Sequence, residues 1–373
     1  MIIYLLSDIE DAKQFEWLVD SNENKKNFKI KFILINNSKK VNKLENFLKK
    51  KDSLLRKYNY RSKFSFFQII SSLFILIIKN RPKIIHCHAR KASIIGITLS
   101  YILRVKKRIY TRHHGDENLN SYFKGYLVDK IISILSTNIV SVSNSTTELL
   151  IQENKNNFSK INEINHGFNF DKFKKMNNEN IIKIRNKYNI YDNKNIIGVI
   201  SRFIDWKGIE FIIMAFKKYC STNRNSILVL ANANGPYRKV ILNYLKDIPK
   251  ENYIIIEFET DIISLYRTFD IFIHAPVDPY CEAFGQVYIE SLAMKIPSIF
   301  TKSGIGKDFL LHKKNCYIAN YKDYSSIYDG IIFFNEINKK QKDNIIENGY
   351  IDVLDKFSLN KMLNKLEFLY KYE

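Results

Sequence analysis

Residues 196–220, IIGVISRFIDWKGIEFIIMAFKKYC, carry the pattern on which the fold prediction depends. Ile196–Ile200 is a short apolar run, which is typical of a strand buried on both faces of a parallel sheet. The polar loop Ser201–Gly208 follows, and Ile209–Cys220 then shows the length and apolar spacing of a helix. A strand, a loop and a helix in this order predict one βα unit.

The same alternation extends toward the amino terminus. Apolar runs of strand length alternate there with segments of helical length and spacing. The expected strands are Ile2–Leu6, Lys29–Ile35, Ile84–Cys87, Arg108–Thr111 and Ile139–Ser143. The expected helices are Asp11–Asp20, Val41–Lys50, Phe64–Lys79, Ala92–Leu103 and Tyr122–Ser136.

A polar, poorly patterned stretch over residues 171–195 precedes a second alternation of the same kind. Its expected strands are Ile196–Ile200, Ile227–Leu230, Tyr253–Ile256, Ile271–His274, Ser298–Thr301 and Cys316–Ala319. Its expected helices are Ile209–Cys220, Pro236–Asp247, Ile262–Phe269, Gly285–Met294 and Tyr324–Phe334.

The sequence therefore predicts an α/β protein made of two Rossmann-like, doubly wound domains with a cleft between them. A chain of 373 residues is long enough for two domains with a core each. We expect an N-terminal domain over residues 1–170, a C-terminal domain over 171–355, and an amphipathic helix over 356–373. Ligands of such folds bind at the carboxyl ends of the strands, so the cleft is the expected site.

The composition excludes several other classes of protein. Hydrophobic residues make up 46% and charged residues 26%, as in a folded globular chain rather than a disordered one. The four cysteines are far apart and form no CxxC pair, so we expect reduced thiols in a cytosolic protein. The apolar segment at the start of the chain is too short for a signal peptide and is soon followed by acidic residues. The apolar stretch Phe64–Ile78 is too short to span a membrane.

The net charge of +21 is concentrated in the first half of the chain. Residues 1–170 hold 29 Lys and Arg against 14 Asp and Glu, and the segment 39–112 holds 20 bases against only Glu45 and Asp52. Such an excess favours an anionic partner. Compositional bias is the alternative, but it does not explain the difference between the halves.

The loop Ser201–Gly208 places two cations at the carboxyl edge of the predicted sheet. Arg202 and Lys207 lie five residues apart, and an anion with spread charge, such as a diphosphate, suits such a pair. The alternative is a solvated loop with two surface bases.

The segment Cys281–Ala293 places a helix start at the same kind of edge. Free backbone N–H groups and the positive end of the helix dipole can bind a phosphate there, and Gly285 permits close backbone approach. Glu282 precedes the helix, and Glu290 lies about 80° from it around the helix axis. Because Glu290 lies among apolar residues, it requires a polar partner.

These two segments resemble the retaining GT-B glycosyltransferases of glycosyltransferase family 4. The shared features are Arg-x4-Lys-Gly after a strand and Glu-x7-Glu within EAFGQVYIESLAMKIPSIF. Ile84–His88, Tyr110–Gly115 and Ile164–Asn169 extend the resemblance over essentially the whole chain. It implies a GT-B fold whose C-terminal helix packs back on the N-terminal domain.

The resemblance also implies roles for individual residues. Arg202 and Lys207 would neutralise the leaving nucleotide diphosphate, Glu282 would approach the donor sugar, and His113 would face the reaction centre. Glu290 would accept hydrogen bonds from the ribose, and residues 257–261 would hold the base largely by backbone groups. The implied donor-binding residues are Phe284, Gly285, Gln286, Glu290, Phe258 and Glu259. No cofactor or metal is then required, and the sequence contains no Asp-x-Asp motif.

The acceptor side departs from the family pattern. The family often has a glycine-rich turn after the first strand, whereas Ser7–Ala12 contains no glycine and three acids. Either this turn bends away from a diphosphate, or Asp8 and Glu10 bind hydroxyl groups of the acceptor. We also expect His88 and Arg90 to line the cleft.

Some histidines have simpler interpretations. His86 and His88 have the spacing of metal ligands, but no further ligands cluster with them, so a packed His86 is the preferred interpretation. Adjacent residues point in different directions, and we expect His113 rather than His114 to face the cleft. His166 and His274 are interpreted as structural.

The expected activity is sugar transfer from a nucleotide-sugar to a glycan or lipid-linked acceptor in cell-surface polysaccharide or lipopolysaccharide synthesis. We expect a cytoplasmic protein, peripheral on the inner face of the cell membrane, that contacts anionic lipid through basic residues of 39–112. In that picture Phe64–Ile78 is mostly core, while nearby bases and Tyr58, Tyr60 and Phe64 touch lipid. Two alternatives remain: a GT-B nucleotide-sugar epimerase, and a nucleic-acid-binding protein in which the bases track phosphates.

Overall fold

The computed structural model describes residues 1–9, 12–25, 28–37, 42–60, 63–115, 123–153, 158–174, 177–190 and 193–371. The chain forms two compact units. The N-terminal unit comprises Met1–Phe168 and Leu359–Glu373, and the C-terminal unit comprises Asn169–Ser358. The predicted domain boundary after residue 170 lies two residues beyond the observed division.

The N-terminal unit is built on a seven-stranded sheet in the order β3-β2-β1-β4-β5-β6-β7. All of its strand pairs are parallel. The strand order reverses direction between β1 and β4, which makes this position the topological switch point. The strands are β1 (Ile2–Ser7), β2 (Ile30–Asn36), β3 (Leu54–Asn59), β4 (Ile84–His88), β5 (Lys107–Arg112), β6 (Asn138–Ser141) and β7 (Ile161–Glu163).

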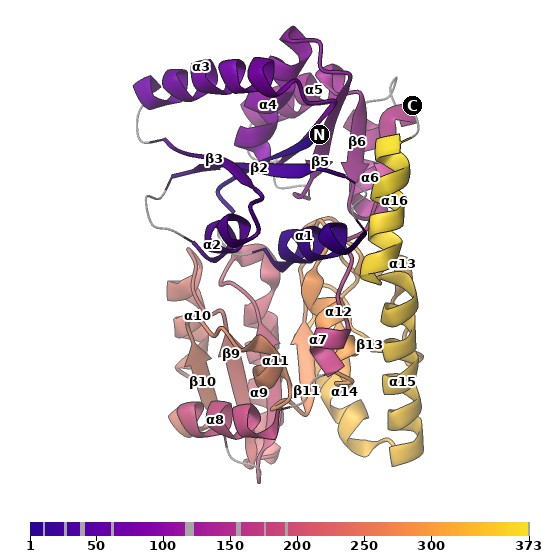
Figure 1. Ribbon diagram of the computed structural model, residues 1–373. Helices are drawn as coiled ribbons and strands as arrows, with labels where there is room; N and C mark the ends of the chain where they lie inside the picture. Colours follow the sequence, from indigo (N-terminus) through magenta and orange to yellow (C-terminus); the bar gives the residue numbers. More distant parts are fainter. Residues whose placement is uncertain are drawn as a thin grey trace. The chain divides into compact units, whose positions relative to one another are not determined.

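Helices cover both faces of this sheet (Figure 1). Alternate strand residues point to opposite faces, so Tyr4 and Leu6 enter one apolar cluster while Ile3 and Leu5 enter another. The first cluster lies under α1 (Lys13–Lys25), α2 (Lys43–Lys50) and α16 (Leu359–Lys371). The second lies under α3 (Lys63–Asn80), α4 (Arg90–Ile102) and α5 (Phe123–Leu135), and α6 (Asn144–Glu153) follows β6.

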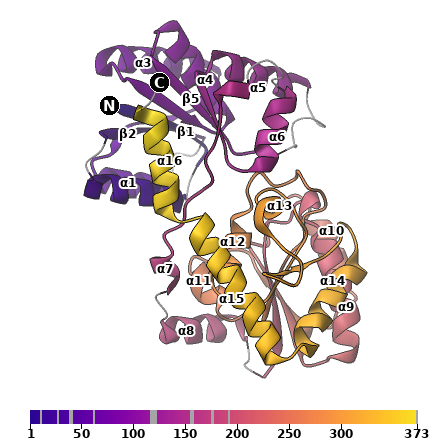
Figure 2. The same ribbon diagram turned by 90° about the vertical axis from the view of Figure 1, so that its right-hand side faces the viewer.

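The last helix of the chain belongs to the N-terminal unit, as predicted. Figure 2 shows α16 lying along the sheet on the side of α1. Met362 and Leu366 are buried in the same apolar cluster as Tyr4. Three polar contacts fix the end of the helix. Tyr370 Oη lies 2.8 Å from His86 Nδ1 and also forms a hydrogen bond with the Tyr4 hydroxyl, and Lys107 Nζ donates to the Leu369 carbonyl at 2.7 Å.

The C-terminal unit has a six-stranded parallel sheet in the order β10-β9-β8-β11-β12-β13. In order of appearance its strands are numbered 3-2-1-4-5-6, which is the Rossmann order with a switch point between β8 and β11. The strands are β8 (Asn195–Ile200), β9 (Ser226–Ala231), β10 (Tyr253–Ile256), β11 (Ile271–His274), β12 (Ser298–Phe300) and β13 (Tyr317–Ile318).

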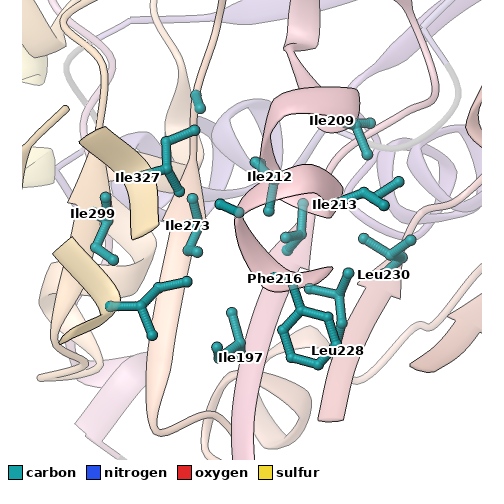
Figure 3. Packing of buried hydrophobic residues seen from close by; sticks show 14 of the residues in the cluster. Ile197, Ile209, Ile212, Ile213, Phe216, Leu228, Leu230, Ile273, Ile299 and Ile327 are labelled. Carbon is teal, nitrogen blue, oxygen red and sulfur yellow. The ribbon is translucent and has the colours of Figure 1, made fainter. Parts of the chain in front are cut away.

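An apolar cluster of this unit lies between the sheet and α9 (Ile209–Thr222). Figure 3 shows Ile212, Ile213 and Phe216 of α9 pointing onto side chains of the central strands. α10 (Arg238–Leu245) and α14 (Tyr324–Glu336) contribute to the same cluster. The other helices of the unit are α7 (Asp171–Lys174), α8 (Asn178–Tyr188), α11 (Ile262–Tyr266), α12 (Gln286–Ala293), α13 (Gly306–Phe309) and α15 (Lys339–Lys356).

The prediction of two Rossmann-like α/β domains is confirmed, although several elements were missed. β3 and β7 lie at the two edges of the N-terminal sheet and are only half-buried, so they lack the continuous apolar run of a central strand. α8 lies in the stretch considered unpatterned, because it buries only Ile184. α15 buries three of its 18 residues and therefore shows little periodicity.

Candidate functional site

The candidate site of the C-terminal unit lies at the carboxyl ends of β8 and β11. The two strands are neighbours in the sheet although β9 and β10 separate them in sequence. Loops that follow them meet at this switch point, where α/β sheets bind ligands. The loop after β8 carries Arg202 and Lys207, and the loop after β11 carries Glu282.

Backbone packing brings the two loops together. Gly208 has φ +64°, and a Cβ atom at this position would lie 2.1 Å from the Ala275 carbonyl oxygen. Glycine is therefore required both for the left-handed conformation and for the close approach. The Val277 N–H donates to the Trp206 carbonyl at 3.0 Å. These contacts place the short 3-10 helix Asp205–Lys207 against the end of β11.

Glu282 is the centre of a buried polar cluster. Its carboxylate forms an ion pair with the Lys207 ammonium, and the same oxygen, Oε1, lies 3.0 Å from His274 Nε2. The Glu282 N–H donates to Ser303 Oγ at 3.1 Å. Glu282 is 8% exposed and His274 1% exposed, so solvent screens these contacts little.

The protonation states of the cluster follow from this geometry. Burial alone would raise the pKa of Glu282, but the Lys207 ammonium and the His274 hydrogen bond lower it to about 2. Burial lowers the pKa of His274, whereas Glu282 acts in the opposite direction. At neutral pH we therefore expect a carboxylate that accepts from both Lys207 and the Nε2–H of a neutral His274.

Arg202 is not part of this cluster. Its side chain is exposed, and within the described residues its guanidinium forms no hydrogen bond or ion pair. The two predicted cations thus differ, because Lys207 is already paired with Glu282 while Arg202 is available to an incoming anion.

The helix after Glu282 begins at Gln286, one residue later than the predicted start at Gly285. Gly285 precedes it with φ +86° and would place a Cβ atom 2.6 Å from the Tyr288 ring. Phe284 is buried and makes an edge contact with Phe357. The chain direction at the helix start is therefore fixed by packing on both sides of the glycine.

Glu290 has the polar partner that its apolar surroundings required. Tyr266 Oη, on α11, donates to Glu290 Oε2 at 3.0 Å. The Glu290 side chain is half-buried, so part of the carboxylate can meet a ligand.

The two predicted donor-binding residues after β10, Phe258 and Glu259, differ in burial and in their contacts. Glu259 is buried and accepts from Lys187 Nζ at 2.7 Å, from Tyr188 Oη at 2.6 Å and from two backbone N–H groups. Burial alone would raise the pKa of Glu259, but these donors lower it to about 2. Phe258 is 66% exposed. The Glu259 side chain is therefore committed within the unit, and Phe258 is the side chain open to a ligand.

In the N-terminal unit, four histidines gather where the strands end. His88 Nδ1 lies 2.8 Å from His113 Nε2, and the His113 and His166 rings stack at 5.3 Å between centroids. His86 is packed, as predicted, with Nε2 2.6 Å from Thr111 Oγ1. The four rings line an open pocket with about 410 Å³ of empty space, together with side chains of α1 and α16.

Burial keeps these imidazoles neutral. It lowers the pKa of His86 to about 3 and that of His166 to about 4, and it lowers the pKa values of His88 and His113 well below their usual range. Neighbouring imidazoles act in the same direction on His88 and His113. At neutral pH the His88–His113 hydrogen bond therefore joins two neutral rings.

The acceptor-side candidates are dispersed. Arg90 forms an ion pair with Asp129 at 3.2 Å rather than lying beside His88. His114 contacts the same Asp129 carboxylate at 3.1 Å. Asp8 accepts from Tyr60 Oη at 2.6 Å and from Lys91 Nζ at 3.0 Å. Burial would raise the pKa of Asp8, but these two donors lower it. Glu10 lies outside the described residues.

The structure corrects one of the predicted lipid contacts. Tyr58 is 9% exposed, and its hydroxyl lies 2.8 Å from Ser72 Oγ, so it belongs to the core of the N-terminal unit. Tyr60 is bound to Asp8 and Lys91. The side chain of Phe64 lies outside the described part of the chain.

Two kinds of feature are absent from the described residues. They contain no group of three or more His, Cys, Asp or Glu side chains arranged to hold a metal ion. None of their helices combines the length and the apolarity needed to cross a bilayer.

Sequence reasoning missed His274 as the partner of Glu282. It ends an apolar strand, where a buried structural histidine is the usual interpretation. Its position at the carboxyl end of that strand, eight residues before Glu282, is the signal that could have identified it.

Comparisons with known proteins find similarity to glycosyltransferases. Residues 180–352 match the family described as glycosyl transferases group 1. The chain is 29% identical over 317 residues to the capsular polysaccharide biosynthesis glycosyltransferase CapM of Staphylococcus aureus, covering 82% of this chain and 81% of CapM. It is 20% identical to the Escherichia coli UDP-Gal:alpha-D-GlcNAc-diphosphoundecaprenol alpha-1,3-galactosyltransferase, with 80% and 78% covered. The crystal structure of Anabaena HepE in complex with UDP-glucose has a TM-score of 0.82 at 17% identity, with 99% of each chain covered.

Proposed function

We propose that this chain, which has the GT-B fold and whose residues 180–352 match the family described as glycosyl transferases group 1, is a glycosyltransferase that transfers a sugar from a nucleotide-sugar donor with retention of anomeric configuration. The family match and the relatives support a role in the synthesis of capsular or other cell-surface polysaccharide. The acceptor in this proposal is a glycan or a lipid-linked sugar. The observation that carries the proposal is the buried Lys207–Glu282–His274 cluster at the switch point of the C-terminal sheet.

The cations of this site are suited to the leaving group. Cleavage of a glycosyl–phosphate bond places negative charge on the departing diphosphate, and preplaced cations stabilise that charge as it develops. Arg202 has no ion-pair partner among the described residues, so its guanidinium can fork onto phosphate oxygens. Lys207 adds a point charge held in place by Glu282.

The carboxylate of Glu282 is suited to the sugar. With a pKa of about 2 it is ionised at neutral pH, so it can attract the positive character that the sugar ring gains. The hydrogen bond from His274 fixes the orientation of the carboxylate. The backbone N–H groups at the start of α12 are oriented for phosphate or sugar oxygens.

Other residues of the C-terminal unit are assigned to the nucleoside. Glu290, with Tyr266 on one oxygen, accepts hydrogen bonds from ribose hydroxyls in this proposal. Residues 257–261 hold the base through backbone groups, with the exposed Phe258 ring beside it. Glu259 supports that loop rather than the ligand, because its carboxylate already accepts five hydrogen bonds.

The N-terminal unit is assigned to the acceptor. His113 is held by His88 and His166 in the open pocket and presents a neutral imidazole there. We include no divalent metal in the reaction. The protein is proposed to be peripheral on the inner face of the cell membrane, where its bases meet anionic lipid.

The test is turnover of the purified chain with UDP-, GDP-, CMP- and ADP-sugars. Glu282→Gln and Lys207→Met are expected to reduce transfer at least a hundredfold with unchanged far-UV circular dichroism. Glu347→Gln removes the carboxylate of an exposed ion pair in the same unit and should leave transfer unchanged. The anomeric configuration of the product, determined by NMR, tests retention. A donor sugar that changes configuration without transfer would identify an epimerase instead. Unchanged turnover in Glu282→Gln would show that the site residues are assigned wrongly.

A further inference from the structure

The outer faces of α3, α4 and α5 are unusually apolar for helices on the surface of a folded unit. α3 buries Ile69, Leu73 and Ile77 against the sheet, one helical turn apart. Its opposite face should be polar in a helix that faces water. That face instead exposes Phe67 (68%) and Ile75 (64%). The prediction that this helix is mostly core therefore holds for its inner face, where Phe66, Ile70 and Leu76 also pack against the cluster, but not for its outer face.

The neighbouring helices continue this apolar surface. Figures 1 and 2 both show α3, α4 and α5 covering the same face of the sheet. Among the side chains that the structure describes on the three helices, nine large hydrophobic ones are exposed, and we call them the apolar ridge. They are Phe67, Phe74, Ile75, Ile78, Tyr101, Ile102, Leu127, Ile131 and Ile134.

Most of the apolar ridge lies at one end of these helices. Each helix leads into the next parallel strand, so the C-terminal turns of all three lie at the amino edge of the sheet. Seven of the nine side chains lie in the C-terminal halves of their helices, from Phe74 in α3 to Ile134 in α5. The Arg108 guanidinium at the start of β5 lies 5.5 Å from the Tyr101 ring, which agrees with this placement.

Bases surround the apolar ridge, and they lack acidic partners. Five exposed bases follow or interrupt its helices, and within the described residues none of them forms an ion pair. They are Lys79, Arg81, Arg104, Lys106 and Lys130. Residues 53–115 contain no Asp or Glu at all, and Asp129 on α5 is buried.

The basic segment expected from sequence to touch lipid differs in this respect. Lys49 and Lys57 both pair with the buried Glu45, and Lys51 pairs with Asp20. These bases are partly neutralised within the unit, whereas those around the apolar ridge are not. At the surface of an anionic bilayer, unpaired cations can bind the headgroups, and exposed apolar side chains beside them can enter the boundary of the acyl chains.

We propose that the apolar ridge, with its unpaired bases, is the surface on which the N-terminal unit docks to an anionic lipid bilayer. This inference rests on the membrane association included in the proposed function and specifies where it occurs. Phe67, in the first turns of α3, lies toward the carboxyl edge of the sheet, because α3 follows β3. The ridge therefore extends from the amino edge toward the edge that carries His88 and His113.

Flotation with vesicles tests the docking surface. The probes are vesicles of phosphatidylcholine alone and of phosphatidylcholine with 30% phosphatidylglycerol, at low salt and at about 0.5 M salt. The wild type is expected to bind the anionic vesicles, and binding should weaken but persist at high salt, because the apolar contribution is not screened. Ile75→Gln/Ile78→Gln should lower partition at least tenfold, since Gln keeps the helix but removes apolar contact.

Matched variants separate the ridge from general surface effects. Ile351→Gln/Phe368→Gln removes two exposed apolar side chains of similar exposure on α15 and α16 and should leave partition unchanged. Arg104→Gln/Lys106→Gln should weaken binding to anionic vesicles more than Lys49→Gln/Lys50→Gln does. Far-UV circular dichroism of each variant checks that the helices persist.

Each other outcome has a definite meaning. Equal binding of wild type and Ile75→Gln/Ile78→Gln overturns the ridge while leaving membrane association intact. No vesicle binding by the wild type overturns both, and transfer to a water-soluble acceptor still tests the enzymatic proposal separately. A dimer in light scattering that the ridge variant dissociates would make this face a contact between two copies and overturn the lipid assignment.

Discussion

Replacement of Lys207 by Met should destabilise the C-terminal unit by about 3 kcal/mol. The pKa of Glu282 falls from its usual 4.5 to about 2 in the folded chain, chiefly because the Lys207 ammonium offsets the cost of burial. Each pKa unit corresponds to about 1.4 kcal/mol, so the ionised carboxylate contributes about 3 kcal/mol to stability at neutral pH. Removal of the ammonium leaves this buried charge with only the His274 hydrogen bond.

The effect has a defined pH dependence. Because the folded pKa lies below the unfolded one, the contribution is complete above about pH 5 and is lost as the pH falls from about 4.5 through about 2. The difference between the wild type and Lys207→Met should therefore be largest near pH 7 and shrink toward pH 3.

Urea unfolding followed by tryptophan fluorescence measures this difference. The chain has two tryptophans, and in a Trp17→Phe background the signal of Trp206 reports on the C-terminal unit. Lys217→Met is the control, since it breaks an exposed pair with Asp247 in the same unit and should cost less than about 1 kcal/mol. A loss for Lys207→Met equal to that of the control, or one independent of pH, would refute the argument.

Three further outcomes are expected. Gly208→Ala should lower the melting temperature of the C-terminal unit in calorimetry, because its Cβ would lie 2.1 Å from the Ala275 carbonyl, and an unchanged melting temperature would contradict this close packing of the two loops. Tyr370→Phe should cost about 1–3 kcal/mol in the N-terminal unit alone, since His86 loses a buried partner; urea titration should show one shifted transition, not two. Sugar transfer should survive EDTA treatment and need no added Mg²⁺ or Mn²⁺, and restoration of lost activity by either metal would show that the metal-free scheme is wrong.

The central strands were predictable because both of their faces are buried. Ile196–Ile200 and Ile271–His274 are apolar at nearly every position, so their length and flanking loops identify them without knowledge of their neighbours. The edge strand β3 is only partly buried, and its sequence LLRKYN therefore mixes apolar and polar residues. A local sequence pattern thus identifies a strand when both of its faces are buried in apolar surroundings.

The chemistry of the site was only partly predictable, because contacts depend on strand order. Lys207 and Glu282 were selected individually, but their ion pair spans 75 residues and requires β8 and β11 to be neighbours. The same applies to Glu259, whose partners Lys187 and Tyr188 lie in a stretch that shows no clear pattern. A residue type at a strand end suggests a role, whereas the partner that sets its protonation comes from tertiary structure.

The return of α16 to the first unit has a consequence for synthesis of the protein. Residues 359–371 are translated only after the whole of the second unit, yet they cover part of one face of the first sheet, beside α1 and α2. Until then, the apolar side chains that Met362 and Leu366 will cover stay open to water on the nascent chain. The later domain can therefore mature before the earlier one, and we expect the incomplete first domain to be the species that chaperones hold during translation.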